Sequence, residues 1–500
     1  MQMQNMSLST LSNPNLLEIN TVLFLGRLQE EYGEEITLGT LPQEVWKSLA
    51  RSGFDLLWCM GMWERSKGSR TSALSEDGLI KDYETALPNW REEDVIGSPY
   101  AVYSYRLDPR FGPEDDLKKL KDSLNREGIG LILDFVPNHL ALDHPWTLSN
   151  PGYFIHAETG ETSSSPDMFF TTKKGNVLAH GKDPYFPSWK DTVQLNYFSQ
   201  DARMALIEEL LRIAHFADGV RCDMAMLVLN SVFEKTWGPF VKDTPKPAQE
   251  FWAEAIDRVK QLYPSFIFIA EAYWDLEWQL QQLGFDYTYD KKLYDLLVNA
   301  PAQQIHDHLW AESSYQNRSV RFIENHDEKR AAAAFGKEKS TAAAIIAATI
   351  PGLHFFHDGQ MAGTTLKQPV QLKRQWKETP DRRLCRFYDR MLGYINHDLV
   401  RRGTWKLMDP APAWESNQTY RNLLSWVWYG DDRFKLVVVN YSPDHSQGRI
   451  YLPRDLMTKN PMVFLDVLTD AQYEREPSNL ISYGLYIDLK PWQAHLFDLA

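Results

Sequence analysis

Four short segments of the chain each end a hydrophobic run with acids, histidines or an arginine. They are Asp134-Phe-Val-Pro-Asn-His139, Gly219-Val-Arg-Cys-Asp223, Ala270-Glu-Ala-Tyr-Trp274 and Phe322-Ile-Glu-Asn-His-Asp327. One such segment would carry little information. Four of them predict carboxylates gathered at the C-terminal ends of parallel strands, where a (β/α)8 barrel places its active site. Two or three carboxylates in one cleft are the groups that glycosidic bond chemistry requires.

Strand and helix patterns alternate around these segments. Phe54 to Met60 and Leu131 to Val136 are continuous apolar runs, which are typical of strands buried on both faces. Pro113 to Arg126 opens with Pro-Glu-Asp-Asp and carries its leucines on one stripe, which predicts a helix. Thr21 to Leu25 is predicted to be an early short strand, and Ser340 to Ile350 an Ala-rich helix. The alternation predicts a parallel sheet with helices outside it, closed as a (β/α)8 barrel.

Two parts of the chain depart from this alternation. Residues 140–193 are rich in Pro, Gly, Ser, Thr, His and aromatic residues without periodicity, which predicts a domain inserted after the third barrel strand. From about residue 401 the chain shows short alternating runs, which predict an antiparallel β-sandwich. We therefore expect a barrel built from residues 1–139 and 194–400, the insertion 140–193, and a C-terminal sandwich at 401–500.

The composition limits the class of protein and of partner. The chain has 500 residues, with a hydrophobic share of 43% and a charged share of 24%, as in ordinary globular proteins. A formal net charge of −14 argues against nucleic acid or an anionic membrane as partner. The first 20 residues lack an apolar signal segment and no apolar stretch is long enough to span a bilayer, so we expect a cytoplasmic location. Three widely spaced cysteines indicate neither a disulfide framework nor a zinc site.

The residue types at the strand ends suggest separate chemical roles. Arg221 lies two residues before Asp223 on the same side of a strand, so its guanidinium can hydrogen-bond that carboxylate and keep it ionised, as a nucleophile must be. Glu271 follows an apolar run, and apolar surroundings raise a carboxyl pKa, which suits a general acid. Asp327 is expected to bind sugar hydroxyls and to stabilise positive charge in the transition state, with His139 lining the same mouth.

Each of these residues also has a purely structural interpretation. A lone Asp at a strand end is usually a turn or cap residue, and for Asp134 we favour this role over direct catalysis. Histidines such as His139 and His326 are often satisfied polar residues. Most tryptophans are expected to pack in cores, except Trp274, which lies close to Glu271. The joint occurrence of the four segments is what favours a functional interpretation.

Together the segments resemble the short conserved regions of the α-amylase superfamily, glycoside hydrolase family 13. The first segment resembles the first region, Gly219 to Asp223 the region with the nucleophile, and Phe322 to Asp327 the region with the transition-state stabiliser, while Glu271 matches the acid/base. Further matches are Ser98-Pro-Tyr100 and Asp108-Pro-Arg-Phe-Gly112, at the approach to the third strand, and Val193-Gln-Leu-Asn196 near the end of the insertion.

The resemblance implies a double displacement that retains the α configuration. Asp223 would attack the anomeric carbon while Glu271 protonates the leaving oxygen, and Glu271 would then activate water or a sugar hydroxyl. Asp327 would be the third member of the catalytic set. The substrate-binding residues expected from the resemblance are Tyr100, His139, Arg221, His326, Trp274 and, besides its structural role, Asp134.

The chain departs from the family pattern after the nucleophile. Many starch-degrading members carry Lys-His where this chain has Met226 and Leu227, which puts the usual +2 sugar contact, and with it action on long polymers, in doubt. That His also often supplies a backbone ligand to a structural calcium. No acidic ligand stands near Asn196, so Asn138 is the one candidate ligand left. We expect no obligatory calcium and no other cofactor.

Several functions remain open at this stage. The preferred one is a hydrolase of α-glucosidic bonds in maltooligosaccharides or related α-glucans. A transglycosylase, either a glucanotransferase or an isomerising enzyme, would use the same carboxylates, and Met226 and Trp274 near the acceptor side favour sugar over water only weakly. A non-catalytic carbohydrate- or protein-binding homologue is disfavoured because Asp223, Glu271 and Asp327 are all present. No phosphate-binding signature supports phosphorolysis, and the linkage and oligomeric state are undetermined.

Overall fold

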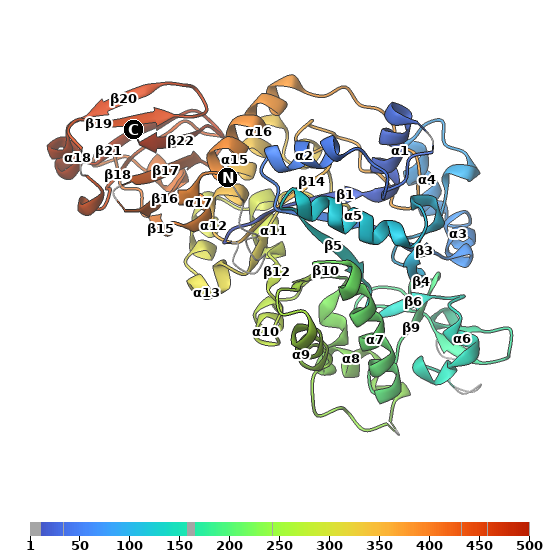
Figure 1. Ribbon diagram of the computed structural model, residues 1–500. Coiled ribbons are helices and arrows are strands. Elements are labelled where there is room, and N and C mark those ends of the chain that lie inside the picture. Colours follow the sequence, from blue (N-terminus) through green and yellow to red (C-terminus); the bar gives the residue numbers. More distant parts are fainter. Residues whose placement is uncertain are drawn as a thin grey trace.

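A closed barrel of eight parallel strands forms the centre of the molecule (Figure 1). The computed structural model describes residues 12–33, 35–157, 166–242, 244–431, 433–457 and 459–499. The barrel strands follow one another around the barrel in chain order, which confirms the predicted (β/α)8 architecture. They are β1 (Asn15–Asn20), β2 (Leu56–Met60), β5 (Gly130–Phe135), β10 (Gly219–Cys222), β11 (Ile267–Ala270), β12 (Tyr287–Tyr289), β13 (Ser319–Arg321) and β14 (Leu353–His357).

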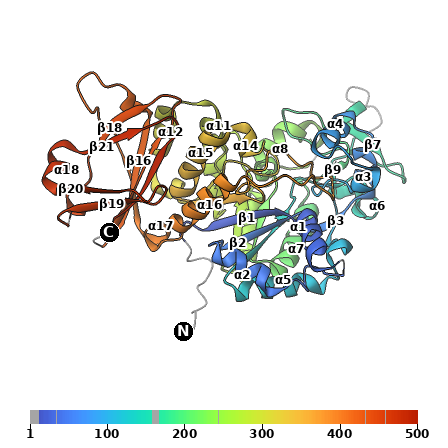
Figure 2. The same ribbon diagram turned by 90° about the horizontal axis from the view of Figure 1, so that it is seen from above.

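Helices cover the outer face of the barrel, and for this reason its strands are apolar on both faces. Every residue of β2 and β5 is buried. In Figures 1 and 2, α2 and α5 lie side by side outside these strands. The main outer helices are α1 (Thr21–Tyr32), α2 (Gln43–Arg51), α5 (Asp115–Arg126), α7 (Gln200–Phe216), α9 (Phe251–Leu262), α11 (Lys291–Asn299), α15 (Lys337–Thr349) and α16 (Arg382–Ile395). Shorter helices are α3 (Lys67–Ala73), α4 (Asp77–Ala86), α8 (Asn230–Trp237), α10 (Glu277–Gln282), α12 (Ala302–Leu309), α13 (Ser313–Gln316), α14 (Ala331–Ala334) and α17 (Asp398–Arg402).

One predicted strand is wrong. Thr21 to Leu25 forms the beginning of α1, and the first barrel strand is the preceding segment β1. All six residues of β1 are buried, including the polar Asn15, Glu18 and Asn20. These polar residues interrupt the apolar run and hid the strand, whereas the short apolar run that follows fits a helix as well as a strand.

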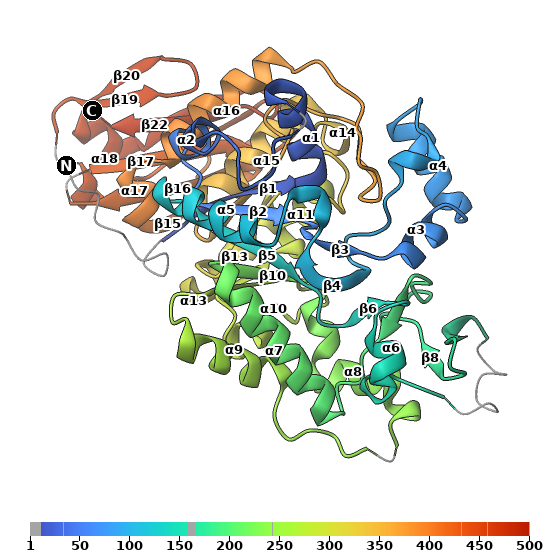
Figure 3. The same ribbon diagram turned by 45° about the vertical axis from the view of Figure 1, so that its right-hand side comes forward.

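The segment between β5 and α7 leaves the barrel and returns to it. A short antiparallel pair, β6 (His139–Ala141) with β9 (Thr192–Gln194), joins its two ends. Between them lie α6 (Trp146–Ser149), β7 (Phe169–Thr171) and β8 (Val177–Ala179), while residues 158–165 of the predicted insertion fall outside the described part. This segment lies on the same side of the molecule as α3 and α4 (Figure 3). These two helices follow the strand β3 (Trp63–Arg65), which pairs with β4 (Val102–Leu107).

The C-terminal part is a separate antiparallel β domain. Its main sheet has the order β15-β16-β17-β22-β19-β20, and β18 pairs with β21 in a second sheet. Apolar residues of both sheets, such as Val427 and Ile487, share one hydrophobic cluster, so the predicted sandwich is confirmed. The elements are β15 (Thr404–Met408), β16 (Leu423–Gly430), β17 (Arg433–Asn440), β18 (Ser446–Ile450), β19 (Met462–Asp466), β20 (Gln472–Arg475), α18 (Pro477–Tyr483), β21 (Leu485–Leu489) and β22 (Ala494–Leu499).

The sandwich packs tightly on the outer helices of the barrel. Trp426, Val437 and Leu496 of its main sheet belong to the same apolar cluster as the barrel core. Trp428 Nε1 donates to the backbone oxygen of Thr349, at the end of α15, over 2.6 Å. Among the helices of the described residues, none combines the length and the apolar character that crossing a bilayer requires.

We expect Trp428→Phe to lower the free energy of unfolding by about 1–3 kcal/mol, because it leaves the buried oxygen of Thr349 without its donor. Chemical denaturation followed by circular dichroism measures the change. Trp414→Phe is the matched control, since Trp414 is 50% exposed, and should have no measurable effect. Equal stability of both variants would contradict a role for this bond at the contact between barrel and sandwich.

Candidate active site

Three carboxylates meet at the C-terminal ends of the barrel strands, as the sequence predicts. Asp223 follows β10 directly, Glu271 follows β11, and Asp327 lies in the loop after β13. All three line one cavity of about 500 Å³. The backbone holds the first two together, because Glu271 N donates to Cys222 O over 3.0 Å, as one strand pairs with the next. The cavity therefore sits where a barrel of this type places its reactive groups.

Arg221 binds two of these carboxylates at once. Its Nη1 lies 2.7 Å from Asp223 Oδ1 and its Nη2 lies 2.7 Å from Glu271 Oε2. The side chain is buried, and its guanidinium carbon lies 5.0 Å and 5.4 Å from the ring centroids of Trp58 and Tyr100. The predicted contact with Asp223 is thus present, but the same cation is shared with Glu271, which the sequence did not indicate.

Burial dominates the proton affinity of Glu271. Its carboxyl is 3% exposed, and burial raises its pKa to about 7, with Arg221 opposing the rise and Asp223 adding to it. Met224 N and Tyr273 OH each donate a hydrogen bond to it over 2.7 Å. A carboxyl with this pKa holds a proton up to neutral pH, which is what a general acid needs.

The pKa of Asp223 differs from the expectation that Arg221 alone would keep this carboxylate ionised. Burial raises the pKa of its carboxyl, and the attraction to Arg221 offsets only part of this effect because the cation also serves Glu271. The two carboxyls thus share one counter-ion, and their proton affinities depend on each other.

Asp327 lies beside a histidine that favours its ionised form. Desolvation acts to raise the pKa of Asp327, but the imidazole of His326, with Nε2 at 2.9 Å from Oδ2, outweighs it and holds the pKa well below its usual range. Tyr100 OH lies 2.8 Å from the same Nε2, and the two rings stack. Lys367 Nζ donates to the backbone oxygen of Asp327. The carboxylate is half exposed toward the cavity and thus available to a ligand.

The other predicted substrate-binding residues divide into two groups. Tyr100 and His139 line the cavity. Burial lowers the pKa of His139 to about 4, so its imidazole is neutral at neutral pH. Trp274 lies outside this lining and is 37% exposed, with its ring in edge contact with Tyr185 of the insertion at 5.0 Å.

Asp134 is held by structural partners, in agreement with the role that the sequence favours. Its carboxylate accepts hydrogen bonds from Trp58 Nε1 at 3.2 Å and from Gly61 N at 2.9 Å. The side chain is buried and is not part of the cavity lining. Asp134 therefore ties β5 to β2 beneath the cavity.

Met226 does not line the cavity, so the prediction that it lies on the acceptor side is wrong. The residue is fully buried in the core, within the short 3-10 helix Ala225–Val228. Met224 has a left-handed backbone with φ of +43°, which turns the chain sharply after Asp223. As a consequence Met224 lines the cavity instead.

Sequence reasoning also missed two residues that line the cavity, and a buried acid outside its lining. Tyr273 lies two residues after Glu271, and its proximity to an acid was the available indication. Trp189 comes from the insertion and contacts His139 at 5.0 Å between ring centroids. Glu18 interrupts the apolar run of β1 and is fully buried. An acid inside an apolar strand needs a partner, and this feature could have identified it.

Comparisons with known proteins place these observations in a family. The family model described as "Alpha amylase, catalytic domain" matches residues 99–422. "Alpha-amylase 3" of Dictyoglomus thermophilum is 25% identical over 304 residues, which is 55% of this chain and 56% of that protein. "Probable oligo-1,6-glucosidase 2" of Bacillus subtilis is 22% identical over 195 residues, 34% of each protein. The chain thus spans about half or less of the length of these curated relatives.

Solved structures agree on the fold over nearly the whole length. A structure described as a noncanonic maltogenic α-amylase, AmyB, from Thermotoga neapolitana superimposes with a TM-score of 0.69 at 18% identity, covering 98% of this chain and 99% of that one. An α-amylase from Lactobacillus plantarum gives a TM-score of 0.65 at 18% identity, covering 99% of each chain. At such identities the likeness concerns the fold alone.

We expect Glu271→Gln to stabilise the protein above neutral pH. The pKa of Glu271 is raised from 4.5 to about 7 in the folded state, so ionising this carboxyl destabilises the fold. The wild-type protein therefore loses stability as pH rises from 4.5 through 7. The variant should therefore unfold with a free energy up to about 3 kcal/mol higher at pH 8, and the difference should vanish near pH 4. Denaturant unfolding at both pH values measures this, with the exposed Glu415→Gln as charge control. A less stable variant at pH 8 would refute the raised pKa.

Proposed function

The chain belongs to the α-amylase family, and from this premise we propose that it hydrolyses α-glucosidic bonds in maltooligosaccharides or related α-glucans. The observation that carries the proposal is the buried Arg221, which bridges Asp223 and Glu271 in one cavity. Retaining glycosidases hold their two carboxyl groups roughly 5 Å apart, a separation that a single bridging guanidinium permits. Asp327, ionised at the same cavity, supplies a third charge.

In the proposed reaction, Asp223 attacks the anomeric carbon and forms a covalent glycosyl-enzyme. Glu271, whose pKa of about 7 leaves it mostly protonated just below neutral pH, donates its proton to the leaving oxygen and so becomes an anion beside Arg221. As Asp223 loses its charge in the covalent bond, Arg221 stabilises the charge that appears on Glu271. Glu271 then takes a proton from water, which attacks the glycosyl-enzyme with overall retention of the α configuration.

The residues around this pair position and stabilise the sugar. Asp327 stabilises the positive charge that develops on the ring, and the nearby His326 and Tyr100 bind its hydroxyls. His139 contributes a neutral imidazole that can accept or donate a hydrogen bond. These roles follow the family resemblance and are consistent with the positions of the side chains.

Transglycosylation with the same residues is a second candidate, favoured by one observation. The exposed rings of Trp274 and Tyr185 contact each other close to the chain segment that carries Glu271, and Lys235 Nζ lies 3.0 Å from Tyr185 OH. Exposed aromatic rings are good surfaces for the apolar faces of sugars. A sugar held there would compete with water for the glycosyl-enzyme.

The partner in either reaction is an α-glucan, and we propose the cytoplasm as the site of action.

We also propose that the fold requires no calcium. Asn138, the one calcium ligand that the sequence suggests, does not suit an oxygen-rich calcium site. Asn138 Oδ1 accepts a hydrogen bond from Gln194 Nε2 at 3.0 Å, and Asn138 Nδ2 donates to Gln194 Oε1 at 3.3 Å. The side chain is therefore already engaged with a neutral amide.

A chromatographic time course with maltoheptaose, maltose, trehalose and sucrose tests the activity. We expect shorter products from at least one substrate, α-configured when first released as read by proton NMR, and a loss of kcat of about 10²- to 10⁴-fold in Glu271→Gln. Glu415→Gln, which removes an exposed carboxylate, should retain full activity. Products longer than the substrate would favour the transglycosylase, and no turnover of any substrate would contradict both candidates.

Chelation tests the calcium proposal. We expect the melting temperature of the purified protein to be the same with and without excess EDTA, because the amide pair of Asn138 and Gln194 needs no ion. Differential scanning calorimetry gives the measurement. A drop that added calcium reverses would show that a structural metal is present.

A further inference from the structure

Glu18 is a buried acid for which neither the family resemblance nor the proposed chemistry gives a role. It lies in β1 and is fully buried. Its Oε1 lies 2.5 Å from Nδ1 of His326, which belongs to the loop after β13. A carboxylate is expensive to bury unless a charged partner compensates it, so this contact has to be strong.

The other nitrogen of the same ring also faces an acid. His326 Nε2 lies 2.9 Å from Asp327 Oδ2 and 2.8 Å from Tyr100 OH. A neutral imidazole has one N–H, whereas carboxylates at both nitrogens can be satisfied together only when both nitrogens carry protons. A carboxylate close to each nitrogen favours the imidazolium form of His326, which lies between the acid of β1 and the acid of the cavity.

The surroundings of the ring are consistent with this charge. Tyr100 stacks on it at 5.3 Å between ring centroids, and Trp58 of β2 contacts it edge-on at 5.6 Å. Behind Glu18, His357 of β14 places Nε2 at 3.9 Å from Oε2. The other charged groups that act on His326 or its partner Asp327 are Asp134 of β5, Asp223 after β10, Arg221 of β10, Glu271 after β11 and Lys367 of the loop after β14.

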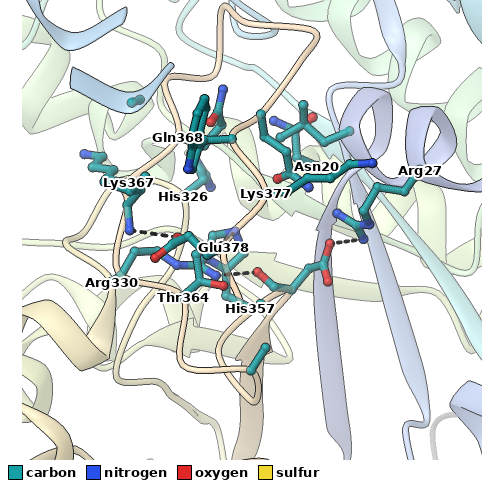
Figure 4. Close-up of a pocket in the computed structure, with 18 of the residues that line it drawn as sticks. Asn20, Arg27, His326, Arg330, His357, Thr364, Lys367, Gln368, Lys377 and Glu378 are labelled. Carbon is teal, nitrogen blue, oxygen red and sulfur yellow. Dashed lines mark hydrogen bonds and ion pairs between the residues drawn. The ribbon is translucent and has the colours of Figure 1, made fainter. Parts of the chain in front are cut away.

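His326 also lines a second cavity, of about 480 Å³, which Figure 4 shows. His326, Arg330 and His357 line it, whereas Glu18 does not. Arg330 and His357 are both bound by another buried acid, Glu324, with its Oε1 at 3.1 Å and 3.3 Å. Glu324 thus lies closest to Arg330 and His357, whereas Glu18 lies much closer to His326 than to His357.

We propose that Glu18 is a positioning residue, which fixes the ring of His326 and keeps both its nitrogens protonated so that Nε2 is directed at Asp327 and the substrate sugar. The inference rests on the proposed function for its catalytic consequence, but the Glu18–His326 pair itself does not. Through His326, Glu18 keeps Asp327 ionised and oriented. It acts without touching the substrate.

Glu18 and His326 each favour the charged form of the other. Burial acts to raise the pKa of Glu18, but His326 and His357 outweigh it and lower the pKa. Burial acts to lower the pKa of His326, but Asp327 and Glu18 outweigh it and raise the pKa well above its usual range. Removing the charge of Glu18 should therefore lower the pKa of His326.

The test is the pH profile of kcat/KM for wild type and Glu18→Gln, which keeps the shape and an acceptor oxygen. In wild type the alkaline limb should report Glu271, near pH 7, because His326 stays protonated throughout. In the variant the deprotonation of His326 should add to this limb and move it to lower pH, with a loss in kcat larger than any change in KM. An unmoved limb would overturn the proposal, even if the variant were less stable.

Asp466→Asn is the matched control. Asp466 is also fully buried and binds a histidine, His495, with Oδ2 at 3.0 Å from Nδ1, but it lies in the C-terminal sandwich. It should lower the melting temperature without moving the pH limb. A shift of equal size in this control would mean that the limb follows general stability, which would overturn the positioning role.

A measurement that needs no turnover separates this inference from the proposed function. In wild type with isotope-labelled histidine, the NMR signal of His326, assigned with His326→Gln, should not titrate between pH 5 and 9. In Glu18→Gln it should titrate within that range. Titration of His326 near its ordinary pKa in wild type would overturn the proposal, whether or not the protein turns over an α-glucan and whether or not Glu18→Gln folds.

Discussion

The shared guanidinium of Arg221 is the interaction on which the cavity depends. Two carboxyls, Asp223 and Glu271, are buried at neighbouring strand ends, and without a cation between them their mutual repulsion and desolvation would be costly. One cation for two acids leaves the pair undercompensated, which is why burial still raises the proton affinity of both. Both acids thus hold their protons more tightly than exposed carboxyls do.

The same arrangement of alternating charges continues around the top of the barrel. Asp327 is followed by His326 and then by Glu18, and Glu324 lies between His357 and Arg330. These side chains come from β1, from β14 and from the loop after β13, and the contact of Glu18 with His326 joins the first strand of the closed barrel to the loop after the seventh. The closure of the barrel and the electrostatics of the cavity therefore stabilise each other.

The sequence was informative wherever a residue's role follows from its own strand. Continuous apolar runs identified β2 and β5, and the acid at the end of such a run identified Asp223 and Glu271. It failed where a partner from another strand decides the role. Glu18 looked like an interruption of an apolar run because its partner His326 is distant in sequence, and β1 was misplaced for the same reason. Met226 was assigned to the cavity because sequence spacing does not show the left-handed turn at Met224.

The sequence by itself determined the class of fold, the identity of the three carboxylates and the order in which the strands present them, because these depend on local periodicity and residue type. Only the tertiary structure decided that Arg221 serves two acids, that Asp134 is bound beneath the cavity and that His326 lies between two carboxylates. The physical reason is that proton affinities and hydrogen-bond partners depend on distances of a few ångströms between segments far apart in the chain. Those distances exist only once the barrel has closed.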